Sequence, residues 1–261
     1  GYWGPNLLRN FAETPGAEVT WCSDMRAERR ELVSRRYPGI RATDDVAEML
    51  RDPSLDAVAI ATPVHTHHRL AKQALLAGKH VLVEKPMAGT VAEAEELVAL
   101  AEGSGLVLMV DHTFVYTGAV QKMKELLTAG ELGDLYYFDS VRVNLGLFQH
   151  DIDVLWDLAP HDLSILTDLV PQTPRAVSAH AVDHTGSGLA DMAYMTVHYD
   201  NAFIAHFHVN WLSPVKVRRI LVGGSRRMVL FDDMEPSEKI RVYDRGVTVS
   251  SKEGIYKALV D

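Results

Sequence analysis

Strand and helix patterns alternate along the first part of the chain, and this alternation limits the fold more than any other feature of the sequence. Short apolar runs end in polar turns and are followed by stretches with helical spacing. The expected strands are 17–23, 56–61, 80–83 and 106–110, and the expected helices are 6–13, 27–37, 44–50, 67–77, 91–102 and 119–128. Strands alternating with helices over short connections form a parallel sheet. The sequence therefore predicts a Rossmann-like parallel-sheet domain over residues 1–113, with 56–61 fully buried.

The pattern changes beyond this point to longer runs in which apolar and polar residues alternate. These runs are 136–144, 176–184, 192–199, 202–211, 216–222, 227–231 and 239–243, with one helix expected at 154–170. Alternation with period two is typical of an antiparallel sheet that has one face covered. We therefore expect residues 114–261 to form an α+β domain with a large open antiparallel sheet that serves substrate binding and oligomerisation.

Composition excludes several classes of protein. The formal net charge of −9, without a basic stripe, argues against a protein that binds nucleic acid through its phosphates. The apolar runs are far shorter than the roughly 20 residues of a membrane-spanning helix, so we expect no membrane association. Cys22 is the single cysteine and excludes an internal disulfide. We therefore expect a cytoplasmic protein, because thiols stay reduced there.

The N-terminal turn has part of a dinucleotide-binding pattern. Gly1, Tyr2, Trp3 and Gly4 lead into a helical stretch whose first amides can bind phosphates. We expect the preceding strand and the first glycine of the pattern to lie upstream of residue 1. Asp24 follows at the end of the next strand, where an acid accepts hydrogen bonds from ribose hydroxyls and favours NAD. Arg26 could pair with a 2′-phosphate, so NADP stays the alternative.

Two further motifs lie at the ends of apolar strands. The first is Ala61-Thr62-Pro63, with His67 four residues further on, and the second is Glu84-Lys85-Pro86. The carboxyl edge of a parallel sheet is where ligands of such folds bind. Lys85 is therefore predicted to lie at a ligand-binding edge.

Together with the glycine turn, these motifs resemble the glucose-fructose oxidoreductase, inositol dehydrogenase and rhizopine-catabolism (Gfo/Idh/MocA) family across essentially the whole chain. In that family the A-T-P strand end lies against the cofactor, the lysine of E-K-P lies between nicotinamide ribose and substrate, and a later D-x-x-x-H supplies the base. The resemblance implies a metal-free NAD(P)-dependent dehydrogenase in which Lys85, Asp157 and His161 are the catalytic residues. It also implies cofactor contacts from 61–63, His67 and Glu84.

The chemistry of these residue types agrees with that assignment. Oxidation of a carbinol needs a base with a pKa near neutrality, which suits His161. Lys85 is expected to donate a hydrogen bond to the reacting oxygen, and Asp157 to bind a neighbouring hydroxyl. Asp157 and His161 share a face if one helix contains both. Pro160 offers an alternative in which the helix starts there and Asp157 lies in the preceding turn.

The substrate is less constrained. Tyr116, Asn144 and Trp156 are expected to line its pocket, because polar-tipped aromatic rings and amides bind sugars. The glycine pair usual before D-x-x-x-H is replaced by 153–154, which resembles the branch that acts on nucleotide-linked amino sugars and uronates, such as UDP-N-acetylhexosamine or uronate 3-dehydrogenases. An inositol or free-polyol dehydrogenase and a 3-ketosugar reductase stay open, as does an NAD-binding regulatory protein without catalysis.

Two remaining features concern metals and assembly. His65, His67 and His68 form a cluster, but it lacks cysteine partners and an H-x-x-x-H helical spacing, so we expect no metal. The open face of the antiparallel sheet is expected to pack against another subunit in a homodimer or homotetramer. The family pattern continues past an equivalent of Asp261, and we expect further strand and helix there.

Overall fold

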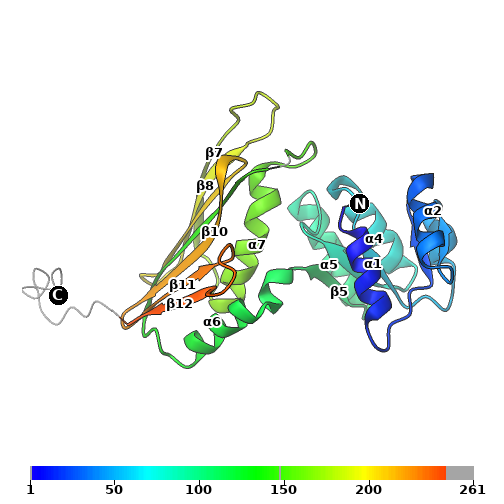
Figure 1. The fold of residues 1–261 in the computed structure, drawn as a ribbon. Coiled ribbons are helices and arrows are strands. Elements are labelled where there is room, and N and C mark those ends of the chain that lie inside the picture. Colours follow the sequence, from blue (N-terminus) through cyan, green and yellow to red (C-terminus); the bar gives the residue numbers. More distant parts are fainter. Residues whose placement is uncertain (1, 147, 245–261) are drawn as a thin grey trace, which may run out of the picture. The chain divides into compact units, whose positions relative to one another are not determined.

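The computed structural model describes residues 2–146 and 148–244. The chain divides into two compact units, the first ending at Asp111 and the second beginning at His112. Each unit has its own sheets (Figure 1). Each also has its own cluster of buried hydrophobic side chains.

The strands of the first unit are all parallel and form two sheets. β1 (Trp21–Ser23) pairs with β2 (Arg41–Thr43), while β4 (His80–Glu84) lies between β3 (Ala57–Ile60) and β5 (Leu108–Asp111). The parallel Rossmann-like arrangement predicted from the alternation of strands and helices is confirmed.

Helices alternate with these strands along the chain. They are α1 (Gly4–Glu13), α2 (Ala27–Arg36), α3 (Val46–Leu50), the short 3-10 helix η1 (Val64–Thr66), α4 (His67–Leu76) and α5 (Val91–Ser104). Leu75 on α4 and Leu97 on α5 pack with Val81 and Val83 of β4 in one buried cluster. This cluster holds α4 and α5 against the sheet of three strands.

The prediction that 56–61 is fully buried is wrong. Ile60 is buried, but Ala57 and Ala59 are exposed. β3 is an edge strand among the described residues, where β4 is its hydrogen-bonded neighbour. A continuous apolar run predicts a strand covered on both sides, and an edge position leaves part of such a strand open.

The second unit contains a sheet of seven strands in the order β12-β11-β10-β6-β9-β8-β7. The strands are β6 (Leu135–Leu145), β7 (Ala176–Val182), β8 (Met192–His198), β9 (Ile204–Asn210), β10 (Leu212–Gly224), β11 (Met228–Asp232) and β12 (Ile240–Tyr243). All neighbours are antiparallel except β6 and β9, which run parallel. The sheet is therefore mixed, because the chain between β6 and β9 crosses over through a helix and the β7–β8 hairpin.

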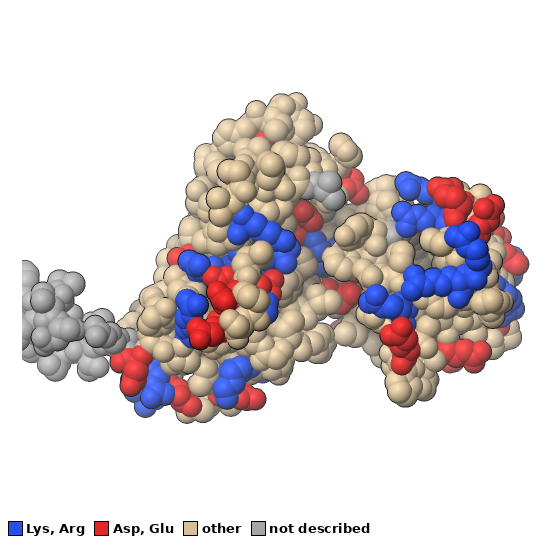
Figure 2. Space-filling view, viewed as in Figure 1, with Lys and Arg blue, Asp and Glu red and all other residues tan. Residues whose placement is uncertain are grey.

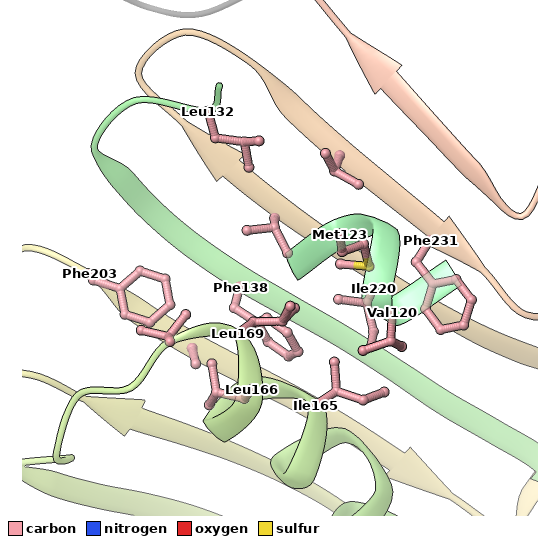
Figure 3. Close-up of a cluster of buried hydrophobic side chains, with 14 of the residues drawn as sticks. Val120, Met123, Leu132, Phe138, Ile165, Leu166, Leu169, Phe203, Ile220 and Phe231 are labelled. Atoms are coloured by element: carbon pink, nitrogen blue, oxygen red, sulfur yellow. The ribbon is translucent and has the colours of Figure 1, made fainter. Parts of the chain in front are cut away.

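Helices cover one face of this sheet. The short 3-10 helix η2 (Thr113–Tyr116) leads into α6 (Gly118–Thr128), and α7 (Val154–Leu169) packs on β6, β8 and β9. Figure 3 shows the buried cluster in which Ile165 and Leu166 of α7 meet Phe138 of β6. In the ranges 2–146 and 148–244, no helix is long and apolar enough to cross a bilayer.

The start of α7 decides between the two readings of Pro160. The helix begins at Val154, and the Asp153 carboxylate accepts a hydrogen bond from the Trp156 amide over 3.0 Å. Pro160 lies inside the helix, where it lacks the N–H that would bond the Trp156 carbonyl. A helix starting at Pro160 is therefore ruled out, because the side-chain cap of Asp153 fixes an earlier start.

Candidate active site

The carboxyl edge of the sheet of three brings several predicted residues together. Residues 61–63 follow β3, Lys85 and Pro86 follow β4, and Asp111 ends β5. The peptide bond between Lys85 and Pro86 is cis. Glu84 is opposite Asp111 in the register of the two strands. Parallel strands present their carboxyl ends on the same side, so these turns share one edge.

One histidine connects two of these turns. His67 begins α4 and is only 1% exposed. Its Nδ1 lies 2.9 Å from the Pro86 carbonyl oxygen, and its Nε2 lies 2.9 Å from the carbonyl oxygen of Thr62. This geometry favours a supporting role for His67, which joins the turn after β3 to the turn containing Lys85, over the direct cofactor contact expected from the sequence.

Glu84 at this edge has a strongly perturbed pKa. Burial and the nearby Asp111 carboxylate raise the pKa of Glu84 from 4.5 to about 7, while Lys85 acts in the opposite direction. The Glu84 carboxyl group is therefore poised to exchange a proton near neutrality. Asp111 was not among the predicted site residues, although its position directly after the apolar run 106–110 indicates the end of a strand at this edge.

The N-terminal turn has groups that fit a dinucleotide. Trp3 precedes α1, and a side-chain carbon added at Gly4 would meet no atom within 4 Å, so a ligand can approach this helix start. Pro5 follows and has no N–H, which leaves one amide donor fewer at the first turn. Residue Gly1, predicted as part of this turn, lies outside the described residues.

Asp24 follows β1 at the position where an acid can accept ribose hydroxyls. Its Oδ1 accepts a hydrogen bond from the Arg26 amide over 2.9 Å. The Arg30 guanidinium donates to the Asp24 carbonyl oxygen at 2.8 Å and pairs with Asp44 at 3.1 Å. The loop after β1 is thus braced by backbone and side-chain contacts around Asp24.

The histidine cluster after β3 separates into different environments. His68 Nε2 lies 2.6 Å from Glu96 Oε2 and so connects α4 to α5, whereas the buried His67 bonds to the two turns. His65 belongs to η1. Among the residues that the structure describes, no three potential ligands are grouped to hold a metal ion.

In the second unit, α7 contains both residues of the D-x-x-x-H motif. Asp157 and His161 are four positions apart in one continuous helix and therefore lie on the same face. The buried Trp211 donates a hydrogen bond from Nε1 to Asp157 Oδ2 over 3.1 Å. The half-buried His161 ring meets the Phe114 ring edge to face, with centroids 5.1 Å apart. The second unit thus orients both side chains of the motif.

The residues predicted to line a substrate pocket come from three elements of the second unit. Tyr116 lies in η2 and is 67% exposed, Asn144 is half-buried near the end of β6, and Trp156 is 37% exposed on α7 next to Asp157. Trp156 directly precedes Asp157 in the sequence of α7. The candidate catalytic residues therefore form two groups: Lys85 in the first unit, and Asp157 with His161 in the second.

Both units match known sequence families. Residues 1–112 match the oxidoreductase family with an NAD-binding Rossmann fold, and residues 120–230 match the Gfo/Idh/MocA C-terminal domain. The chain therefore contains the NAD-binding Rossmann domain of this family, in agreement with the fit of the groups around Gly4 and Asp24.

Three relatives illustrate the range of similar proteins. The uncharacterized oxidoreductase YdgJ of Escherichia coli is 30% identical over 88% of this chain and 68% of its own length. The scyllo-inositol 2-dehydrogenase (NADP(+)) IolW of Bacillus subtilis is 28% identical over 78% of this chain and 55% of its own. The dTDP-3,4-didehydro-2,6-dideoxy-alpha-D-glucose 3-reductase of Streptomyces violaceoruber is 34% identical over 49% and 37%. The chain thus spans between about a third and two thirds of the length of these relatives. It belongs to the Gfo/Idh/MocA family of NAD-binding oxidoreductases.

Proposed function

We propose that this protein is an NAD(P)-dependent dehydrogenase that acts on a carbinol carbon of a sugar or a nucleotide-linked sugar. The observation that supports this most is the placement of Asp157 and His161 on one face of α7. A carboxylate and an imidazole at this spacing can bind neighbouring hydroxyls of one substrate, and the imidazole can take the proton from the hydroxyl that is oxidised.

The proposed roles follow the chemistry of each side chain. His161 is the general base, because an imidazole accepts a proton near neutral pH. Asp157, whose Oδ2 is oriented by Trp211, accepts a hydrogen bond from an adjacent hydroxyl. Lys85 donates to the reacting oxygen and stabilises negative charge there.

The cofactor is proposed to be held by the first unit. The start of α1 at Gly4 would hold the pyrophosphate, Asp24 the adenosine ribose, and the turn at 61–63 with Glu84 the nicotinamide half. The bound nicotinamide supplies the redox chemistry. His67 lies between the two turns, with one ring nitrogen 2.9 Å from a carbonyl oxygen of each.

The proposed substrate class is a nucleotide-linked amino sugar or uronate oxidised at carbon 3. Two observations support it: 153–154 replaces the glycine pair usual before the motif, and one relative reduces a dTDP-sugar at position 3. The name of IolW favours the alternative of an inositol or another free polyol. A 3-ketosugar reductase uses the same residues with the proton returned by His161.

The test is a panel of UDP-sugars, free sugars and inositols with NAD or NADP, followed by NADH or NADPH absorbance. We expect turnover of a UDP-sugar, and Lys85→Ala and His161→Ala proteins that bind NAD normally yet lose at least about a hundredfold in kcat. Substantial activity in both variants would refute the roles. Tight NAD binding without turnover of any compound would favour a regulatory protein.

The proposal includes assembly through the uncovered face of the large sheet. Tyr194 of β8 and Ile204 of β9 lie on that face and are 42% and 41% exposed. Apolar residues left open on a sheet favour burial against another subunit. Light scattering after gel filtration should give the mass of a dimer or tetramer, and Tyr194→Lys should lower it to that of one chain. A cytoplasmic location is consistent with the single cysteine.

A further inference from the structure

A fully buried ion pair lies next to the proposed base in the second unit. The side chains of Arg142 on β6 and Asp162 on α7 are 4% and 2% exposed. Arg142 donates from Nε to Asp162 Oδ2 at 2.9 Å and from Nη2 to Oδ1 at 2.6 Å, and the Ser140 hydroxyl donates to Oδ2 at 2.8 Å. Buried charges are costly unless they are paired with good geometry. This pair has such geometry and anchors α7 to β6 at the residue directly after His161.

One aromatic ring connects this ion pair to His161. The guanidinium carbon of Arg142 lies over the Phe114 ring, 4.6 Å from its centroid. The same ring contacts the imidazole of His161 with centroids 5.1 Å apart and an interplanar angle of 74°. Phe114 belongs to η2, so three segments, η2, β6 and α7, meet around the base.

The contact matters because a histidine ring is not held by its own torsions. Rotation about χ2 has broad, roughly twofold minima, so a half-turn puts each ring nitrogen where a ring carbon was, unless a neighbour fixes the plane. A general base acts only when its nitrogen is within hydrogen-bond distance of the proton that it takes. Asp162 fixes where the helix presents residue 161, and the edge-to-face contact with Phe114 restricts the plane of the ring.

We propose that Phe114 is a positioning residue that holds the His161 ring in its reactive orientation, itself held by the cation–π contact with the buried Arg142. Phe114 contacts no reacting atom in this proposal. The catalytic consequence rests on the proposed role of His161 as base. The orientation of the His161 ring does not depend on that role, and it can be measured without any substrate.

The decisive experiment is NMR of the histidine ring of residue 161 in the full chain with NAD. His161→Gln assigns the signal among the twelve histidines. Phe114→Leu keeps the apolar bulk but removes the aromatic ring, and Phe114→Tyr restores it. Phe203→Leu is the matched control, because Phe203 packs in the same core against the Tyr199 ring, with centroids 5.0 Å apart and an interplanar angle of 56°.

We expect ring relaxation to show a restricted His161 ring in the parent protein, in Phe114→Tyr and in Phe203→Leu, and a ring that reorients over a wider range in Phe114→Leu. An equally restricted ring in Phe114→Leu would overturn the proposal. With the UDP-sugar of the panel that is turned over fastest, kcat should fall by about tenfold in Phe114→Leu while KM changes by less than about twofold.

The two proposals fail in different ways. If His161→Gln keeps full turnover, His161 is not the base, yet the relaxation data still decide whether Phe114 orients the ring. If His161→Gln is inactive but Phe114→Leu has parental ring motion and parental kcat, the base assignment stands and the positioning role is refuted.

Discussion

Glu84→Gln tests the electrostatics of the proposed cofactor edge without any substrate. Burial and Asp111 raise the pKa of Glu84 from 4.5 to about 7 in the folded protein. Each pH unit by which folding moves a pKa corresponds to about 1.4 kcal/mol, so the full shift corresponds to roughly 3 kcal/mol. Because the side chain is partly exposed, solvent screening reduces the expected contribution to about 1–2 kcal/mol.

The sign follows from proton binding. The folded protein holds a proton on Glu84 more tightly than the unfolded chain, so this contribution to stability is complete below pH 4.5 and is lost as the pH rises through about 7. Gln resembles the protonated acid and does not ionise. We therefore expect Glu84→Gln to match the parent protein below about pH 4.5 and to exceed its free energy of unfolding by about 1–2 kcal/mol above about pH 8.

The measurement is urea unfolding of the parent protein and the variant across this pH range, followed by far-ultraviolet circular dichroism. Asp111→Asn is the matched second variant, because removing that carboxylate lowers the pKa of Glu84 and should weaken the pH dependence of the parent protein. A stability difference between Glu84→Gln and the parent that does not change with pH would refute the reasoning.

Four further substitutions have definite expected outcomes. His67→Gln removes the buried ring whose nitrogens face a carbonyl oxygen of each turn, so unfolding in urea should show a loss of about 1–3 kcal/mol and titration calorimetry weaker NAD binding; unchanged values for both would exclude the supporting role. Asp24→Ala should weaken NAD binding by roughly tenfold while NADP binding changes less, measured by the same calorimetry; an equal loss for both cofactors would contradict the ribose contact. Gly103→Ala should raise the melting temperature, because the added carbon meets open space on α5 and alanine is favoured over glycine in a helix by about 0.5–1 kcal/mol. Gly224→Ala should lower the melting temperature, because the added carbon would lie 2.2 Å from the Leu132 carbonyl oxygen.

Local sequence patterns predicted the positions of helices and strands better than they predicted which strands pair and in which direction. The E-K-P motif and the apolar run before it placed Lys85 at the end of β4, because strand end and turn are both encoded within a few residues. The parallel pairing of β6 with β9 was not predicted, because a half-covered strand has the same alternation whichever way its neighbour runs. Such pairing depends on contacts between distant residues.

The same distinction applies to the candidate site. Asp157 and His161 were identified through the resemblance to the family's D-x-x-x-H motif, whereas the cap at Asp153 shows that the helix runs through Pro160. The contacts of Phe114 with Arg142 and His161 join three separate segments, so no local pattern reports them. Charged residues on the visible face of the second unit are of both signs (Figure 2), and pairs such as Arg219 with Asp232 are equally non-local.

The position of β6 in the large sheet has a consequence for how the protein is made. Both neighbours of β6, β9 and β10, lie towards the C-terminus, and about sixty residues separate the end of β6 from the start of β9. At a synthesis rate of roughly 5–20 residues per second, β6 leaves the ribosome about 3–12 seconds before either neighbour exists. During that interval its unpaired edges and apolar side chains, Phe138 among them, are available to chaperones or to other nascent chains, which makes β6 the segment of the second unit most exposed to misassembly.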